Sequence, residues 1–350
     1  MKKVKAAIVG CGRISVCYEY SFNKLSDMIE LVYAVDTDEK KAKDFAAKFN
    51  CNYTTNFDEI LDKDIDVIHL CTPHYLHAPM AIKAMKAGKH VLTEKPMAIT
   101  LQDADEMIKV SDETGKKLGV IFQTRYTKSC DVIKEIISSG KLGKIIGARS
   151  YLTWKRPDSY YLESNWKGTW DKEGGGVLID QAIHSIDRVQ YLLGSDVEWI
   201  QGSIHNFCHD IVKVEDTADA VIKFKNGCIY NLFACNVYVD DSPINIEIIG
   251  EKGKVGLLQD MGFVDIDGQY TEIRKTYEEV YVGPTYWGSS HHLQLADFYN
   301  SIIRNLPVTL DGREGRKTLE IIKGIYKSST ENQRVYLPFE DINMANAYMK

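Results

Sequence analysis

The chain has 350 residues, of which 44% are hydrophobic and 26% charged, and its formal net charge is −6. A domain with a single hydrophobic core is usually shorter than this chain, so we expect two domains. The acidic balance and the scattered lysines and arginines argue against a nucleic-acid partner and against a membrane-surface role. The first residues lack the apolar run of a signal peptide, and no segment reaches the roughly 20 apolar residues that span a bilayer.

The eight cysteines form no CxxC pair, and several lie in apolar, strand-like runs. This pattern is typical of buried, reduced thiols. We therefore expect a cytoplasmic protein without a bound metal.

The first third of the chain alternates short apolar runs with helical patterns. Strands are predicted over residues 4–9, 29–36, 66–72, 90–93 and 117–121. Residues 13–24 fit a helix, and apolar residues at helical spacing predict further helices over 38–49 and around 78–85, where Gly88 can end the helix; another is expected to run to about 114. Thr100 and Asp103 form a capping box for the last of these helices. Strands that alternate with helices of this length predict a parallel, doubly wound sheet.

The pattern changes after about residue 145. Two β-rich runs between residues 219 and 235 flank Asn226-Gly227, which predicts a hairpin, and further strands are expected over 244–249, 253–258 and within 261–282. Helices are expected over about 177–193, around 295–302 and over 313–329. The sequence thus predicts an α/β protein with a doubly wound domain over 1–122. A second α/β domain with an open, mostly antiparallel sheet follows over 123–350, and its last helices are expected to pack back on the first domain.

A glycine-rich turn follows the first strand. Gly10-Cys11-Gly12-Arg13-Ile14-Ser15 reads G-x-G-x-x-S, where the first glycine permits the turn and the second lets a pyrophosphate approach a helix N-terminus. Ser15 replaces the third glycine and is small enough for helix–strand packing. Asp36 ends the second strand, where its carboxylate can accept both ribose hydroxyls and repel a 2′-phosphate. We expect NAD, with NADP as the alternative, and contacts from Gly10, Gly12, Arg13, Ile14 and Asp36.

Two further segments carry a family resemblance. One runs from Cys71-Thr72-Pro73-His74 through His77 to the string AGKHVLTEKP at residues 87–96, and the other holds the glycine triplet 174–176 followed by Asp180, His184 and Asp187. With the glycine turn, they make the chain resemble the family of glucose–fructose oxidoreductase, inositol dehydrogenase and the rhizopine-catabolism proteins, from the N-terminus to about residue 330. The resemblance implies an NAD(P)-binding Rossmann domain followed by an open-sheet α/β domain. It also implies hydride transfer at a secondary hydroxyl of a sugar, inositol or related polyol.

The resemblance also implies roles for single residues. Lys95 of Glu94-Lys95-Pro96 would reach the reactive hydroxyl, and Glu94 would approach the cofactor ribose. The remaining cofactor contacts would come from Thr72, Pro73, His74, His77 and Gln123. This chain departs from the family at His74, where Asn is frequent, and at Ala182, where Gly is frequent. We also predict a cis peptide bond between Lys95 and Pro96.

Oxidation of an alcohol needs a base as well as a hydride acceptor. His184 suits the base because imidazole titrates near neutral pH, and Lys95 would stabilise the alkoxide or take the proton itself. Asp180, one turn earlier, would orient the imidazole. At 100° per residue Asp180, His184 and Asp187 share one stripe, opposite the apolar residues Ala182, Ile186, Val189 and Leu193. Without the family match, this polar stripe would be read as a solvated helix face.

An aromatic and cationic loop over residues 154–170 is the expected substrate contact, since aromatic faces suit sugar C–H surfaces. Packing against a neighbouring subunit is the alternative. Besides Lys95, Asp180 and His184, the expected substrate-binding residues are Arg125, Trp154, Arg156, Trp166 and His292.

Three functions stay open at this point. The first is an NAD-dependent dehydrogenase of a sugar or polyol, acting as a homodimer or homotetramer through the second domain's sheet. The second is a glycosidase that uses NAD for a transient oxidation. The third is a non-catalytic, NAD-sensing regulator.

Overall fold

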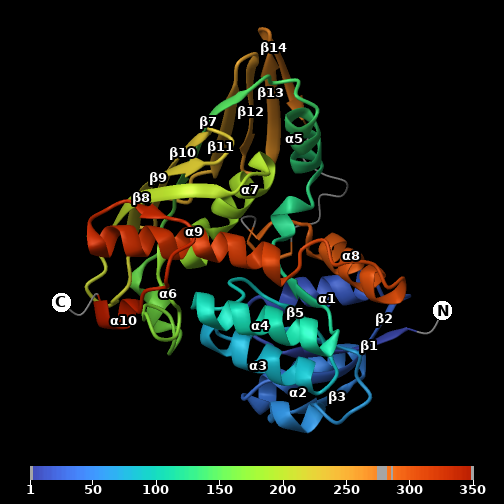
Figure 1. Ribbon diagram of the computed structural model, residues 1–350. Helices are drawn as coiled ribbons and strands as arrows, with labels where there is room; N and C mark the ends of the chain where they lie inside the picture. The colour runs from blue at the N-terminus through green and yellow to red at the C-terminus, as the bar shows by residue number, and fades with distance from the viewer. Residues whose placement is uncertain (1–2, 274–281, 285–286, 348–350) are drawn as a thin grey trace. The chain divides into compact units, whose positions relative to one another are not determined.

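A computed structural model describes residues 3–273, 282–284 and 287–347 of the chain (Figure 1). The chain divides into two compact units. Unit 1 comprises Met1–Gln123 and Val280–Arg316, and unit 2 comprises Thr124–Glu279 and Lys317–Lys350. Within the described residues no helix is long and apolar enough to cross a membrane.

Unit 1 is built on a six-stranded sheet of order β3-β2-β1-β4-β5-β6 in which neighbouring strands are all parallel. This confirms the doubly wound parallel sheet, and the strand order is that of a Rossmann fold. The strands are β1 (Val4–Val9), β2 (Ile29–Val35), β3 (Asn52–Thr54), β4 (Val67–Leu70), β5 (His90–Thr93) and β6 (Leu118–Val120). The helices are α1 (Ser15–Lys24), α2 (Glu39–Phe49), α3 (His74–Lys86), α4 (Leu101–Thr114) and α8 (His291–Ile303), with short 3₁₀ turns at Phe57–Ile60 and Gln123–Arg125.

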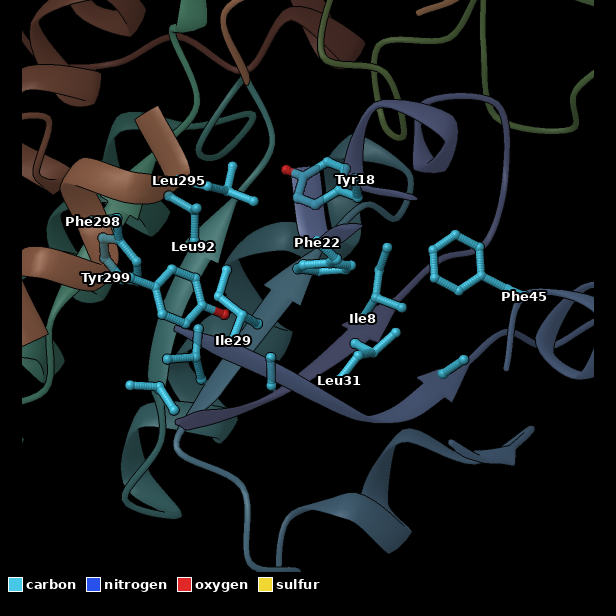
Figure 2. Close-up of a cluster of buried hydrophobic side chains, with 14 of the residues drawn as sticks. Ile8, Tyr18, Phe22, Ile29, Leu31, Phe45, Leu92, Leu295, Phe298 and Tyr299 are labelled. Carbon is cyan, nitrogen blue, oxygen red and sulfur yellow. The ribbon is translucent and has the colours of Figure 1, made fainter. Parts of the chain in front are cut away.

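The core of unit 1 joins segments that are far apart in the sequence. Figure 2 shows Leu92 of β5 and Phe22 of α1 in one cluster with Leu295, Phe298 and Tyr299 of α8. Helix α8 therefore belongs to this unit although it lies late in the chain. Its close approach explains Gly119 of β6, where a Cβ atom would lie 2.8 Å from both Leu92 and Phe298.

Unit 2 is built on a nine-stranded sheet of order β14-β13-β12-β11-β7-β10-β9-β8-β15. The pair β7–β10 is parallel and every other neighbouring pair is antiparallel, which confirms the mostly antiparallel second sheet. The strands are β7 (Ile145–Thr153), β8 (Val197–His205), β9 (Thr217–Phe224), β10 (Ile229–Cys235), β11 (Asn245–Gly250), β12 (Gly253–Leu258), β13 (Met261–Ile266), β14 (Gln269–Ile273) and β15 (Val335–Tyr336). The Asn226-Gly227 hairpin joins β9 to β10 as predicted.

Helices cover one face of the second sheet (Figure 1). Helix α5 (Lys128–Ser138) packs on β12 and β13, and α7 (Ile183–Leu193) packs on β7. Helix α9 (Gly312–Glu331) bonds to β8, where Ser328 Oγ accepts the Gly202 N–H at 3.1 Å. The short helices α6 (Asp158–Leu162) and α10 (Met344–Ala347) complete the unit.

The region expected to form one α-helix over residues 177–193 begins differently. Residues Leu178–Ala182 form a turn of π-helix, and the α-helix α7 starts at Ile183. The assumption of 100° per residue is therefore wrong across the first turn, because a π turn takes more residues than an α turn. The apolar residues expected to face the sheet are buried: Ala182, Ile186, Val189 and Leu193.

The core of unit 1 predicts a stability effect. Phe298→Ala should lower the free energy of unfolding by about 3 to 5 kcal/mol, because it removes a fully packed ring that links α8 to the sheet. Leu306→Ala, at a half-exposed position of the same unit, should change it by less than about 0.5 kcal/mol. Urea unfolding followed by tryptophan fluorescence measures both. Equal losses in the two variants would contradict the assignment of α8 to this core.

Candidate active site

The glycine turn after β1 is formed as the sequence requires. Gly10 has φ +97°, and a Cβ there would collide with the carbonyl of Cys71, so only glycine fits. A Cβ at Gly12 would meet no atom within 4 Å, which leaves open space beside the backbone. Ser15 closes the turn because its Oγ donates to the Gly12 carbonyl at 2.7 Å. Room at Gly12 and a tight turn at Gly10 are the features that a pyrophosphate needs at a helix N-terminus.

Asp36 is tied into this turn. Its Oδ2 accepts the backbone N–H of Cys11 at 2.8 Å, and its Oδ1 accepts the N–H of Asp38 at 2.9 Å. The side chain is half-buried at the end of β2. Since each carboxylate oxygen can accept more than one hydrogen bond, both oxygens keep capacity for the two hydroxyls of a ribose.

The segment after β4 is linked to the one after β5 through His77. One ring nitrogen lies 2.7 Å from the Pro96 carbonyl oxygen and the other lies 2.8 Å from the Thr72 carbonyl oxygen. His74 begins α3 directly after Pro73 and is also buried. A single buried ring thus joins two of the predicted cofactor segments.

Glu94 and Lys95 differ sharply in their surroundings. Glu94 is buried, and its Oε1 accepts a hydrogen bond from the Tyr18 hydroxyl at 2.9 Å while His291 Nε2 lies 4.0 Å away. Burial raises the pKa of Glu94 to about 7, against the opposing effect of Lys95. Lys95 is only half-buried, and the Lys95–Pro96 bond is cis, as predicted.

The remaining predicted residues of unit 1 gather around α1 and the start of α8. Gln123 Nε2 donates to the Trp287 carbonyl at 2.9 Å, and the Arg13 guanidinium lies 5.8 Å from the Trp287 ring centre. His292 meets the ring of Tyr20 edge to face at 5.6 Å. Ile14 packs against the hydrophobic core. Trp287 is a contact that sequence reasoning missed, because it stands in a segment without periodicity.

In unit 2, the glycine triplet is explained by Glu215. The two oxygens of this buried carboxylate accept the backbone N–H groups of Gly176 and Leu178 at 2.8 and 3.0 Å, and the Tyr326 hydroxyl donates to Oε1 at 2.9 Å. A Cβ at Gly176 would collide with the Glu215 backbone, and one at Gly175 with the Tyr326 hydroxyl. The triplet therefore lets a buried carboxylate anchor the start of the π turn.

Asp180 lies in the π turn and His184 in the first turn of α7; His184 is half-buried, and the side chain of Asp180 is 9% exposed. Three donors reach one oxygen of Asp180. Tyr160 Oη lies 2.5 Å from Oδ2, Lys167 Nζ 2.7 Å and Gln181 Nε2 2.9 Å. The sequence expectation paired Asp180 with His184, but it gave no hint of Tyr160 or Gln181 as partners.

Asp187 does not share the setting of Asp180 and His184. It is fully buried, and Arg125 holds it through two hydrogen bonds, from Nε at 2.8 Å and from Nη2 at 2.7 Å. Thr318 adds a third bond at 3.0 Å, and the Arg125 guanidinium stacks 4.5 Å from the Tyr191 ring. The expected stripe thus divides into Asp180 with His184 and a buried structural ion pair.

The aromatic loop is likewise partly structural. Arg156 is buried, and its Nη1 donates to Asp241 Oδ1 at 2.9 Å. Trp154 is buried beneath the Arg156 guanidinium, with Nε1 donating to the Ser242 carbonyl at 3.0 Å. Trp166 stays half-buried, 4.6 Å from Lys167 Nζ. Among the described residues no group of three or more potential ligands is placed to hold a metal ion.

A parallel sheet in Rossmann order, a glycine turn after β1 and an acid at the end of β2 define a dinucleotide-binding unit. Residues 4–122 match the model of the oxidoreductase family with an NAD-binding Rossmann fold, and residues 131–256 match the GFO/IDH/MocA C-terminal domain. The chain belongs to this oxidoreductase family, as the sequence predicts, and its first unit is an NAD-binding domain.

Relatives of known activity match over nearly the whole chain. The chain is 26% identical to myo-inositol 2-dehydrogenase of Thermotoga maritima, covering 95% of this chain and 98% of that protein. It is also 26% identical to D-glucoside 3-dehydrogenase of Escherichia coli, covering 95% and 97%. The structure of the WlbA dehydrogenase from Bordetella pertussis in complex with NADH and UDP-GlcNAcA is 29% identical, with a TM-score of 0.85 over 97% of this chain and 100% of that one.

The buried carboxyls predict how stability depends on pH. Burial raises the pKa of Glu215, like that of Glu94, to about 7 in the folded protein, from an ordinary value near 4.5. The folded state therefore binds these protons more tightly, so the stabilisation is complete below about pH 4.5 and is lost as the pH rises through 7. Each of these two carboxyl groups accounts for about 3 kcal/mol of pH-dependent unfolding free energy. We expect a lower Tm at pH 8 than at pH 6.

Glu215→Gln should flatten this dependence, since the amide does not titrate. Glu340→Gln, at an exposed carboxylate, should leave it unchanged. Scanning calorimetry between pH 5 and 8.5 gives the slopes, and a Tm that rises with pH in the unmodified protein would contradict the assignment.

Proposed function

We propose that the protein transfers a hydride between a secondary hydroxyl of a sugar, inositol or sugar derivative and NAD. One observation carries the proposal: nearly the whole chain matches, at 29% identity, a dehydrogenase whose structure holds NADH and UDP-GlcNAcA. The curated relatives named above, which act on myo-inositol and on D-glucosides, support the same substrate class. The functional group shared by such substrates is a secondary alcohol, a ring carbon that carries one hydrogen and one hydroxyl group.

Lys95, Asp180 and His184 are the residues that we assign to the chemistry. Bound nicotinamide supplies the hydride acceptor. His184 takes the hydroxyl proton, and the ammonium group of Lys95 stabilises the negative charge that develops on the oxygen. Asp180 stabilises the imidazolium that results. Lys95 and His184 are only partly buried, whereas the Asp180 side chain is 9% exposed and, like the buried Glu94 and Asp187, is bonded to protein groups.

The residues of unit 1 fit an NAD molecule. The open space at Gly12 would take the pyrophosphate and the fixed carboxylate of Asp36 the ribose hydroxyls. The same carboxylate would repel the extra phosphate of NADP. We propose that the further cofactor contacts come from Arg13, Ile14, Thr72, Pro73, His74, His77, Glu94 and Gln123.

For the substrate, Trp166 is an aromatic residue of the loop that stays half-buried, as Tyr160 does. His292 remains a proposed contact as well. Arg125, Trp154 and Arg156 are bonded to other parts of unit 2, so we propose that they support the binding surface and that backbone or hydroxyl groups near them meet the substrate.

A panel of sugars, inositols and nucleotide sugars, each with NAD and with NADP, tests the proposal through absorbance at 340 nm. We expect at least one compound to reduce NAD faster than NADP. With that substrate, His184→Gln and Lys95→Met should each lower kcat about 10² to 10⁴-fold, because each removes a group that acts on the transferred proton or its charge. Lys86→Met, an exposed lysine on α3, is the matched control and should stay within about twofold.

Other results would support one of the alternative functions or refute the assigned residue roles. Hydrolysis of a glycoside without net NADH would replace the dehydrogenase by a glycosidase that oxidises its substrate transiently. Tight NADH binding without turnover of any compound would favour a regulator. Full activity of His184→Gln and Lys95→Met would refute the assigned roles.

We further propose that the chain forms a homodimer or homotetramer through the open face of its nine-stranded sheet. The strand register places Tyr151, Ile249 and Leu258 on one face, beside an ion-paired row in which Arg149 and Lys254 contact Glu247 at 3.0 and 3.2 Å. Large exposed apolar residues next to self-complementary charges suit a second copy of the same face.

Sedimentation velocity measures the oligomer. Tyr151→Glu should shift the protein towards monomer, because two like charges would meet across a twofold interface. Tyr53→Glu, at a similarly exposed position of unit 1, should leave the oligomer intact. A monomer in the unmodified protein would refute this interface.

A further inference from the structure

Lys167 is a buried cation that the proposed chemistry leaves unused. Its Nζ donates to Asp180 Oδ2 at 2.7 Å and to the Tyr160 hydroxyl at 2.8 Å, and it lies 3.5 Å from Glu173 Oε1. Its side chain is 14% exposed, and those of Glu173 and Asp180 are 1% and 9% exposed. Three polar groups, from α6, the following loop and the π turn, thus meet at the Lys167 ammonium group.

Stability alone does not account for this cluster. Taking charges out of water costs free energy, and a buried ion pair often contributes less than a well-packed apolar group of the same size. The hydrogen bonds of the cluster also converge on one atom: Tyr160, Lys167 and Gln181 all donate to Oδ2 of Asp180. Donors that converge on one oxygen fix the rotation of a carboxylate about its axis.

We propose that Lys167, assisted by Tyr160, is a positioning residue that holds Asp180 as an ionised carboxylate in one orientation. This inference deepens the proposed function, since it rests on Asp180 acting with His184. The three hydrogen bonds favour the charged form of Asp180 over the protonated form. A carboxylate that is stabilised in its charged form stabilises an imidazolium on His184 better than it competes for the proton.

The charges of the cluster agree with this role. Burial would lower the pKa of Lys167, but the charges of Asp180, Tyr160 and Glu173 outweigh it and hold the pKa well above its usual value. Burial raises the pKa of Glu173 to about 8, against the effect of Lys167.

Four variants test the proposal: Lys167→Met, Lys167→Arg, Tyr160→Phe and the control Lys172→Met. Lys172 lies in the same segment, and its Nζ donates to the Asn165 carbonyl at 3.2 Å rather than to Asp180. Crystal structures report the orientation of the Asp180 carboxylate, and the pH profile of kcat/KM reports the acid–base pair. NADH affinity and Tm report the integrity of the fold.

If Lys167 positions Asp180, the carboxylate turns away in Lys167→Met while NADH affinity is kept. The kcat/KM falls about 10 to 100-fold and the acidic limb of its pH profile moves. Lys167→Arg restores part of the activity, because it returns a cationic donor. Tyr160→Phe, which removes one donor and no charge, gives a smaller loss, and Lys172→Met matches the unmodified protein.

An Asp180 carboxylate that keeps its orientation in Lys167→Met overturns the proposal. So does a loss of activity that leaves the pH profile unmoved and follows Tm across all variants, since that describes a purely structural lysine. If no compound is turned over by the unmodified protein, the proposed function fails. The crystal structures of Lys167→Met and Tyr160→Phe then still decide whether these residues hold Asp180.

Discussion

The carboxylate of Glu215 is the contact on which the second unit's candidate site depends. The first N–H groups of a helix have no partner within the helix, and here Glu215 accepts two of them, from Gly176 and Leu178. The arrangement needs a side chain buried against the backbone, so the glycine triplet follows from the space that Glu215 and Tyr326 occupy. It also raises the pKa of Glu215, because a charge is held away from water. The positions of Asp180 and His184 follow from where this anchor starts the π turn.

Unit 1 also places a buried carboxyl group directly beside a residue assigned to chemistry. Glu94 is buried and held by Tyr18, while the adjacent Lys95 is only half-buried. In unit 2 the Lys167 that holds Asp180 and Asp180 itself are both shielded, with side chains 14% and 9% exposed. In unit 1 a shielded carboxyl thus adjoins a more exposed group assigned to chemistry, whereas in unit 2 the lysine and the carboxylate are shielded together. A side chain locked by packing loses less freedom when it orients its neighbour than one that is mobile in water.

Features set by local chemistry could be predicted from the sequence. The alternation of strands and helices, the tight turn at Gly10 and the hairpin at Asn226-Gly227 each follow from a few neighbouring residues. Features that need a distant partner could not. Arg125 and Asp187 are 62 positions apart and Gly176 and Glu215 are 39 apart, and no local pattern relates them. The sequence does not predict β7 and β8, since neither strand alternates apolar and polar residues: β7, for example, buries Ser150 and exposes Ile146 and Tyr151. The π turn has no sequence signature at all.

The ion pairs that Arg156 and Lys167 form within the protein indicate which charge a substrate can carry near them. Arg156 already contacts Asp241, whose side chain is 36% exposed, and Lys167 contacts Asp180, whose side chain is 9% exposed. An acidic group of a ligand would have to compete with the Lys167–Asp180 pair and would leave the Asp180 carboxylate without its cation, which is costly. A hydroxyl group can donate and accept hydrogen bonds beside such pairs without displacing a charge. On the proposed function, a reacting ring next to Asp180 would therefore be better matched by neutral hydroxyls than by a carboxylate or phosphate, and any charged part of a substrate would bind farther from this cluster.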